Sequence, residues 1–175
     1  MGVISVQKLV LMVLPNSRVI FLIVFLGCVG LMCVALYMQH VLDLEPCNLC
    51  ILQRVMVIVV ALIALIAAIH GSKDLGIKVY ASLIALSATI GAGISSRQLW
   101  LQSLPEDQVP ACGASLDYLL DVFSLTEALS MVLAGDGECA KVLWLFLGIS
   151  IPGWTLVGFI GLTIIGLFQL TRPKC

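Results

Sequence analysis

Long apolar stretches separated by short polar segments run through the whole chain. Four of these stretches can cross a bilayer, which requires about 20 residues of helix. We expect membrane spans at residues 19–37, 51–69, 79–96 and 152–170. The last span lies within an uncharged run, 142–170, that is too long for one untilted helix. Pro152 favours a helix start at that point, because proline fits the first turn of a helix better than its interior.

The connection at 97–151 is long enough to hold structure of its own. Residues 99–110 are loop-like, since Pro105 and Pro110 break regular structure. From Leu116 to about Leu133, polar residues recur every three to four positions opposite a stripe of leucines, which predicts one amphipathic helix. It can lie along the membrane surface or pack on top of the bundle. We expect the Gly-Asp-Gly sequence at 135–137 to end this helix and to present Cys139 on a mobile segment.

The composition agrees with a membrane location. The 175 residues are 61% hydrophobic and 11% charged, against roughly 45–50% and about 25% in soluble domains. We therefore predict an all-α membrane protein: one domain over residues 1–175, built as a four-helix transmembrane bundle with a short amphipathic helix in its long outer loop.

The basic residues predict how the bundle is oriented. Six of them flank the same ends of the four spans, namely Lys8, Arg18, Lys73, Lys78, Arg172 and Lys174. Cytoplasmic segments carry the excess of lysine and arginine, so both termini are expected in the cytoplasm. The acidic segments 38–50 and 97–151 would then face the outer side of the membrane. The first apolar stretch exceeds the 7–15 residues of a signal-peptide core, which favours a retained span.

Four of the seven cysteines lie on the predicted outer side: Cys47, Cys50, Cys112 and Cys139. Because disulfides persist in an oxidising compartment such as the periplasm, these four suggest two pairs. Cys28 and Cys33 lie inside the first span, where a free cysteine usually serves as a small packing residue. Cys175 is a thiol of the cytoplasmic tail.

The sequence Pro46-Cys47-Asn48-Leu49-Cys50 is the most informative motif. If a helix begins near Pro46, both thiols lie at its N-terminus, which favours negative charge. Arg54 follows one turn after Cys50 and can stabilise a thiolate. Redox chemistry with a lipid-soluble acceptor fits this position, and a quinone accepts the two electrons that a dithiol releases. Arg54 would then stabilise the thiolate or donate hydrogen bonds to a quinone carbonyl.

Other interpretations of these residues remain open. Arg54 can be an interfacial anchor whose charge reaches the headgroup region. The CxxC can be a structural disulfide, or half of a zinc site completed by Cys112 and Cys139. These two cysteines do not form a second CxxC, so the usual zinc spacing is missing and we predict no metal site. A disulfide that only closes the long loop is a further possibility for Cys112 and Cys139.

The chain resembles the DsbB family of bacterial inner-membrane disulfide oxidoreductases over nearly its whole length. The resemblance rests on Pro46-Cys47-x-x-Cys50-x-x-x-Arg54, Pro110-Ala-Cys112-Gly, Gly137-Glu-Cys139-Ala, Phe146-Leu-Gly148 and Pro152-x-Trp154. It implies an enzyme that keeps the periplasm able to form disulfides. A reduced thioredoxin-like partner of the DsbA type would attack the Cys112–Cys139 disulfide at Cys112.

The same resemblance implies how the electrons continue. Cys139 would exchange with Cys47, leaving Cys50 as the thiolate that faces a membrane quinone, either ubiquinone or menaquinone. Arg54 corresponds to the arginine of the quinone site, and Arg97 and Gln98 align with the region that lines its other side. A vitamin K epoxide reductase-like enzyme, also a four-helix bundle with a CxxC, is one alternative. A disulfide-stapled membrane scaffold without turnover is another. No nucleic-acid partner is expected.

Overall fold

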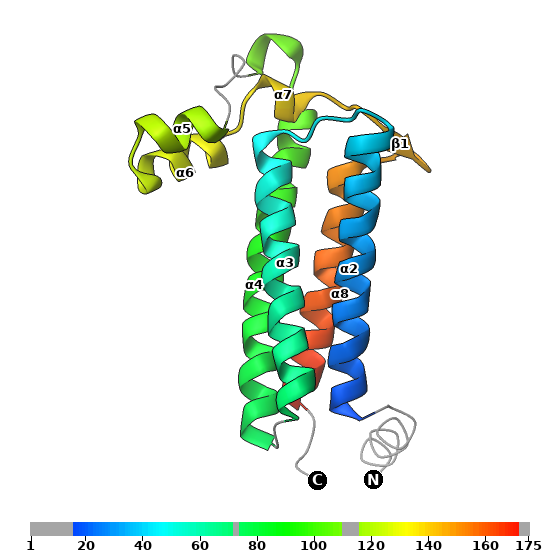
Figure 1. Ribbon diagram of the computed structural model, residues 1–175. Coiled ribbons are helices and arrows are strands. Elements are labelled where there is room, and N and C mark those ends of the chain that lie inside the picture. Colours follow the sequence, from blue (N-terminus) through cyan, green and yellow to red (C-terminus); the bar gives the residue numbers. More distant parts are fainter. Residues whose placement is uncertain (1–15, 72–73, 110–115, 172–175) are drawn as a thin grey trace, which may run out of the picture.

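A computed structural model describes residues 16–71, 74–109 and 116–171. Four long helices form a bundle, α2 (Ser17–Val41), α3 (Asn48–His70), α4 (Asp74–Gln102) and α8 (Ile151–Thr171) (Figure 1). Each contains one of the predicted spans, and each is long and apolar enough to cross a membrane. The prediction of an all-α membrane protein built on four spanning helices is confirmed.

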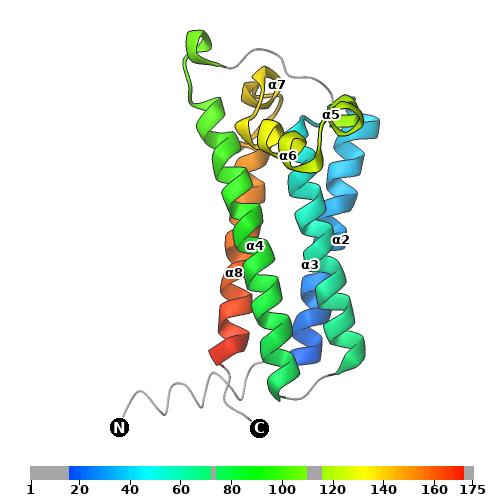
Figure 2. The same ribbon diagram turned by 90° about the vertical axis from the view of Figure 1, so that its left-hand side faces the viewer.

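Successive helices of the bundle run in opposite directions (Figures 1 and 2). The start of α2 and the end of α8 therefore lie at one end of the bundle, while the start of α3 and the end of α4 lie at the other. We call the second end the cysteine end, because Cys47, Cys50 and Cys139 gather there. The short elements of the 103–150 segment also lie at this end (Figure 1).

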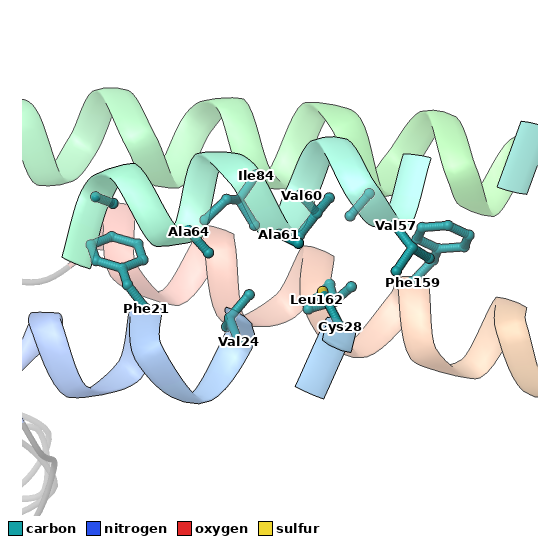
Figure 3. Close-up of a cluster of buried hydrophobic side chains, with 12 residues drawn as sticks. Phe21, Val24, Cys28, Val57, Val60, Ala61, Ala64, Ile84, Phe159 and Leu162 are labelled. Carbon is teal, nitrogen blue, oxygen red and sulfur yellow. The ribbon is translucent and has the colours of Figure 1, made fainter. Parts of the chain in front are cut away.

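The bundle core is filled by apolar side chains from all four helices (Figure 3). Its labelled members are Phe21, Val24, Cys28, Val57, Val60, Ala61, Ala64, Ile84, Phe159 and Leu162. Cys28 is 1% exposed and serves as a packing residue, whereas Cys33 lies on the exposed surface of α2. Large apolar side chains also cover the outside of the four helices, as expected for surfaces that face lipid.

Small residues bring α4 and α8 close together. A Cβ atom at Gly166 of α8 would lie 2.9 Å from the Ala85 Cβ and 3.0 Å from the Ala81 carbonyl oxygen of α4. Gly91 of α4 leaves the space that the Phe159 ring occupies. Close backbone approach through small residues is a typical way for helices to associate in a membrane.

Helix α4 continues past the point where a loop was expected. The segment was predicted to become loop-like at Leu99, but α4 ends only at Gln102. Leu101 is 1% exposed and packs at the cysteine end, so the last turn is held by burial. The chain leaves the helix just before Pro105, which the sequence identified as a breaker. Arg97 and Gln98 consequently project from a helix.

The single amphipathic helix predicted from Leu116 to about Leu133 is divided in two. The structure has α5 (Leu116–Val122) and α6 (Leu125–Ala134), which begins after Ser124. The Ser124 backbone N–H donates to the Glu127 carboxylate at 3.2 Å, as in a capping box. This local competition with the helical hydrogen bonds starts a new helix where the leucine pattern alone predicts continuity.

Four further short elements complete the cysteine end. The 3₁₀ turn η1 (Glu106–Gln108) follows α4, and α7 (Gly137–Ala140) follows α6. Two strands, β1 (Leu145–Phe146) and β2 (Ile149–Ser150), form an antiparallel hairpin before α8. Its turn places Leu147 at φ 52° and Gly148 at φ 78°, the left-handed conformation of tight hairpins. Pro152 lies in the first turn of α8, where the helix was predicted to start.

Candidate active site

The CxxC motif lies at the N-terminus of α3. Cys47 is the N-cap residue, with extended backbone angles of φ −69° and ψ 167°, and Cys50 lies in the first helical turn. Both are free thiols, and their sulfur atoms are 3.1 Å apart. Because backbone N–H groups at a helix N-terminus favour negative charge, a thiolate is stabilised at this position.

A glutamine of α4 contacts both sulfur atoms. Gln98 is 2% exposed, and its Nε2 donates to the Cys50 sulfur at 3.2 Å and to the Cys47 sulfur at 3.3 Å. Its Oε1 accepts a hydrogen bond of 2.7 Å from Nε2 of Gln53, which is also buried. The Gln53 side chain therefore fixes which end of the Gln98 amide faces the sulfur atoms. An amide N–H donor directed at sulfur stabilises the thiolate form.

Cys139 approaches the Cys47 sulfur from α7. Its side chain is fully buried and packs with Leu49 and Leu101. The Cys139 sulfur interacts with the Cys47 thiol and with the backbone N–H of Leu49. The sequence placed Cys139 on a mobile segment after the glycines. In the structure it lies in an ordered, buried turn, because Asp136 caps α7 by accepting the Cys139 N–H at 3.0 Å.

The three thiols influence one another's protonation. Hydrogen bonds from the Cys47 thiol to Cys139 and to Cys50, together with burial, raise the pKa of Cys47. The hydrogen bond received from Cys47 lowers the pKa of Cys139, and backbone N–H groups of Leu49 and Asp136 add to this effect against the opposing effect of burial. Cys139 is thus the better nucleophile of this pair, and Cys47 is the sulfur it faces.

Arg54 lies one turn after Cys50 and extends toward α2. Its guanidinium donates to the Gln39 side chain and, at 3.1 Å, to the Ala35 carbonyl oxygen. Both acceptors belong to α2, so they hold the positive charge beside the start of α3. This position allows the charge of Arg54 to favour a Cys50 thiolate. Its predicted contact with a quinone stays a prediction.

Arg97 has a different environment from Gln98, although the two are adjacent. Its guanidinium donates to the Ala134 carbonyl oxygen at 2.9 Å and to the Leu133 carbonyl oxygen at 3.3 Å, and lies 4.2 Å from the Trp100 ring centroid. These carbonyls end α6, so Arg97 attaches the outer helices to α4. The contacts direct Arg97 away from the sulfur atoms that Gln98 touches.

A pocket opens beside the CxxC on the side facing α8. It encloses about 30 Å³, or about 310 Å³ when its open mouth is included. Its lining is mixed: polar or charged side chains come from Cys47, Cys50, Gln98, Gln102, Glu138, Lys141 and Ser150, and apolar ones from Leu143, Trp144, Ile151 and Pro152. Such a combination suits a flat apolar ring with a few polar substituents.

The comparison with known proteins identifies the family. Residues 17–169 match the family model described as disulfide bond formation protein DsbB. The chain belongs to the DsbB family. Disulfide bond formation protein B of Saccharophagus degradans is 59% identical over 91% of this chain and 96% of its own length. The proteins of that name from Marinobacter nauticus and Hahella chejuensis are 53% and 52% identical, over 90% and 91% of this chain and 94% and 97% of their own lengths.

Membership of the DsbB family confirms the resemblance and has direct consequences. The chain is a multi-pass membrane enzyme, a disulfide oxidoreductase of the disulfide bond formation pathway. A scaffold without turnover is thereby set aside, as is the vitamin K epoxide reductase-like alternative.

The structure brings together only part of the site predicted for this DsbB family member. Cys47, Cys50, Cys139 and Gln98 meet at the cysteine end, whereas Cys112 lies outside the described residues. Sequence reasoning missed Gln53 and Asp136. The sequence could have indicated Gln53, because it is a polar residue in an apolar helix and lies three positions after Cys50, on the same helical face. Asp136 was assigned to a helix break, and its capping contact depends on the fold.

Proposed function

We propose that this enzyme reoxidises a periplasmic thioredoxin-like dithiol protein of the DsbA type and passes the electrons to a membrane quinone. The observation that carries the proposal is the continuous contact from Cys139 through Cys47 to Cys50. Thiol–disulfide exchange requires an attacking thiolate, an accessible disulfide and a good leaving thiol. This row of sulfur atoms supports the proposal, because Cys139 can attack Cys47 of a Cys47–Cys50 disulfide and Cys50 can leave.

The first exchange takes place with the partner protein. A partner thiolate attacks Cys112 of a Cys112–Cys139 disulfide, which forms a mixed disulfide and releases Cys139 as a thiolate. The second thiol of the partner then displaces Cys112, so the partner leaves oxidised. Two electrons have entered the enzyme. The backbone N–H groups of Leu49 and Asp136, which also lower the pKa of Cys139, support its role as the leaving thiol and as the next nucleophile.

The second exchange is internal. The Cys139 thiolate attacks Cys47, the Cys47–Cys139 bond forms, and the Cys47–Cys50 bond breaks with its electron pair on Cys50. The helix N-terminus and the Gln98 amide stabilise the Cys50 thiolate, and the charge of Arg54 adds to this. Cys112 then attacks Cys139, which restores the outer disulfide and leaves Cys47 and Cys50 as a dithiol.

The final acceptor in this proposal is ubiquinone or menaquinone. A quinone supplies the two-electron, two-proton acceptor chemistry that closes the cycle. The pocket beside Cys50 supports this choice, because it places apolar side chains of Leu143, Trp144 and Ile151 next to the Cys50 sulfur. Arg54 is proposed to act on Cys50 through its charge, since both of its described hydrogen bonds go to α2.

We further propose that the enzyme lies in the bacterial inner membrane with both termini in the cytoplasm. Lysine and arginine dominate the opposite end of the bundle in the sequence, which supports placing the cysteine end in the periplasm. A dithiol partner in the periplasm would then reach Cys112, and a quinone would reach the pocket from the lipid.

Anaerobic quinone reduction tests the proposal. The purified enzyme is mixed with a reduced DsbA-type protein and ubiquinone or menaquinone, and quinone absorbance is followed. We expect quinone loss that depends on both the enzyme and the dithiol protein, with one quinone reduced for each partner disulfide formed. The absence of quinone reduction by an enzyme whose Cys47–Cys50 pair is intact would contradict the proposal.

A substitution separates the two halves of the reaction. Cys112→Ser should abolish quinone reduction by the partner protein but leave reduction driven by dithiothreitol, which can attack Cys47–Cys50 directly. Equal loss with both donors would contradict the assignment of Cys112 to the partner step.

A further inference from the structure

Asp136 joins the two segments that must meet for the internal exchange. It is 8% exposed, and its two carboxylate oxygens accept from different partners. Oδ1 accepts the backbone N–H of Cys139 at 3.0 Å, and Oδ2 accepts Nδ2 of Asn48 at 3.0 Å. Asn48 is the residue directly after Cys47 and begins α3. One carboxylate therefore links the residue beside Cys47 to the backbone of Cys139.

The position of the Cys139 sulfur depends on contacts from outside its own short helix. Cys139 lies in a helix of four residues, Gly137–Ala140, which is too short to be stable alone. Gly135 precedes it at φ 78°, so the chain enters α7 through a glycine conformation. With so little structure of its own, α7 relies on contacts with α3 and α4 to hold the Cys139 sulfur against Cys47.

We propose that Asp136 is a positioning residue, which together with Asn48 holds Cys139 in register with Cys47 for the internal thiol–disulfide exchange. This inference rests on the proposed function. Asp136 does not itself react or exchange a proton in the step. It fixes the approach of the Cys139 sulfur to Cys47, and the leaving electron pair still goes to Cys50.

A cross-linking rate tests this positioning without turnover. In a Cys50→Ser/Cys112→Ser background, Cys47 and Cys139 remain as a pair, and oxidised dithiothreitol drives formation of the Cys47–Cys139 disulfide. Asp136→Ala removes the hydrogen bonds to both the Cys139 N–H and Asn48, so we expect it to slow the cross-link about tenfold or more. Asp121→Asn removes an exposed carboxylate from α5 and should leave the rate unchanged.

A reciprocal exchange of the two side chains distinguishes positioning from general stability. In Asn48→Asp/Asp136→Asn, the amide oxygen at 136 can accept the Cys139 N–H and the amide nitrogen can donate to the new carboxylate at 48. We expect Asp136→Asn and Asn48→Asp each to slow cross-linking and the double variant to restore at least half of the original rate. Slow cross-linking in all three variants, or normal cross-linking in both single variants, would overturn the proposal.

The rate of quinone reduction provides the second readout. In the otherwise unmodified enzyme, Asp136→Asn should slow partner-driven quinone reduction while dithiothreitol-driven reduction stays normal, because dithiothreitol bypasses Cys139. Equal loss with both donors would assign Asp136 a merely structural role and overturn the inference. If the unmodified enzyme itself shows no partner-driven reduction, the proposed function fails, while the cross-linking rates still decide whether Asp136 positions Cys139.

Discussion

At the scale of single residues, two buried amides organise the reactive thiols. Gln53 and Gln98 are 4% and 2% exposed, and Nε2 of Gln53 on α3 donates to Oε1 of Gln98 on α4. The sequence could identify the cysteines, because their chemistry is carried by residue type and spacing. It could not show that Gln98 faces sulfur while Arg97 faces the end of α6, because adjacent helical positions differ by about 100° and tertiary packing decides which one is buried.

The amide pair makes a stability prediction. Gln98→Met should destabilise the protein by about 1–3 kcal/mol, because it leaves the Gln53 Nε2 buried without its acceptor. Gln53→Met/Gln98→Met should cost less than the single change, since both polar groups are then removed. Unfolding of the purified variants by SDS in mixed micelles measures the difference. A double variant less stable than Gln98→Met would contradict this account of the pair.

Arg54 makes a kinetic prediction. Arg54→Ala should raise the apparent KM for quinone and slow the step that forms the Cys50 thiolate, because the charge near Cys50 is lost. Arg54→Lys keeps the charge but not the planar group that bonds Gln39 and Ala35, so it should recover part of the activity. Steady-state quinone reduction at several quinone concentrations measures both. Unchanged quinone dependence together with an unchanged maximal rate in Arg54→Ala would remove Arg54 from the site.

At the scale of elements, apolar length predicted the four spans and local chemistry decided where elements end. Hydrophobic runs placed the helices because the bilayer requires them. The extension of α4 to Gln102 and the division of α5 from α6 at Ser124 were not predicted, because burial of Leu101 and a capping box override the coarse pattern. The hairpin at 145–150 was not predicted.

The close packing of α8 on α4 leads to a third prediction. Gly166→Ala should destabilise the bundle by about 1–3 kcal/mol, because the new Cβ would overpack against Ala85 and the Ala81 carbonyl oxygen. Gly161 lies on the same helix with open space where its Cβ would be. Gly161→Ala should therefore be neutral or slightly stabilising, as alanine favours helix. The same SDS titration compares them, and equal effects would contradict close packing at Gly166.

At the scale of the whole molecule, the bundle separates the end that its basic residues flank from the end that carries the reactive cysteines. The alternating helices place the reactive cysteines at one end, while the basic residues of the sequence flank the other. If the basic end lies in the cytoplasm, the cysteine end lies in the periplasm. There it can meet soluble protein dithiols, and at the membrane boundary it can meet lipid-soluble acceptors.

The proposed orientation of the bundle in the membrane leads to a fourth prediction. In intact cells with the outer membrane made permeable, a membrane-impermeant maleimide should label reduced Cys112 but should not label Cys175. Disruption of the inner membrane should expose Cys175 to the reagent. Labelling of Cys175 before disruption would reverse the proposed orientation.

The central claim is that electrons pass from Cys139 to Cys47 before they reach the quinone. The most direct measurement mixes quinone-free enzyme with one equivalent of reduced DsbA-type partner, quenches with acid at successive times and maps disulfide-linked peptides by mass spectrometry. The account predicts a Cys47–Cys139 linked peptide with a free Cys50 thiol in the same samples. Reduction of Cys47–Cys50 by the partner without this linked peptide at any time would contradict it.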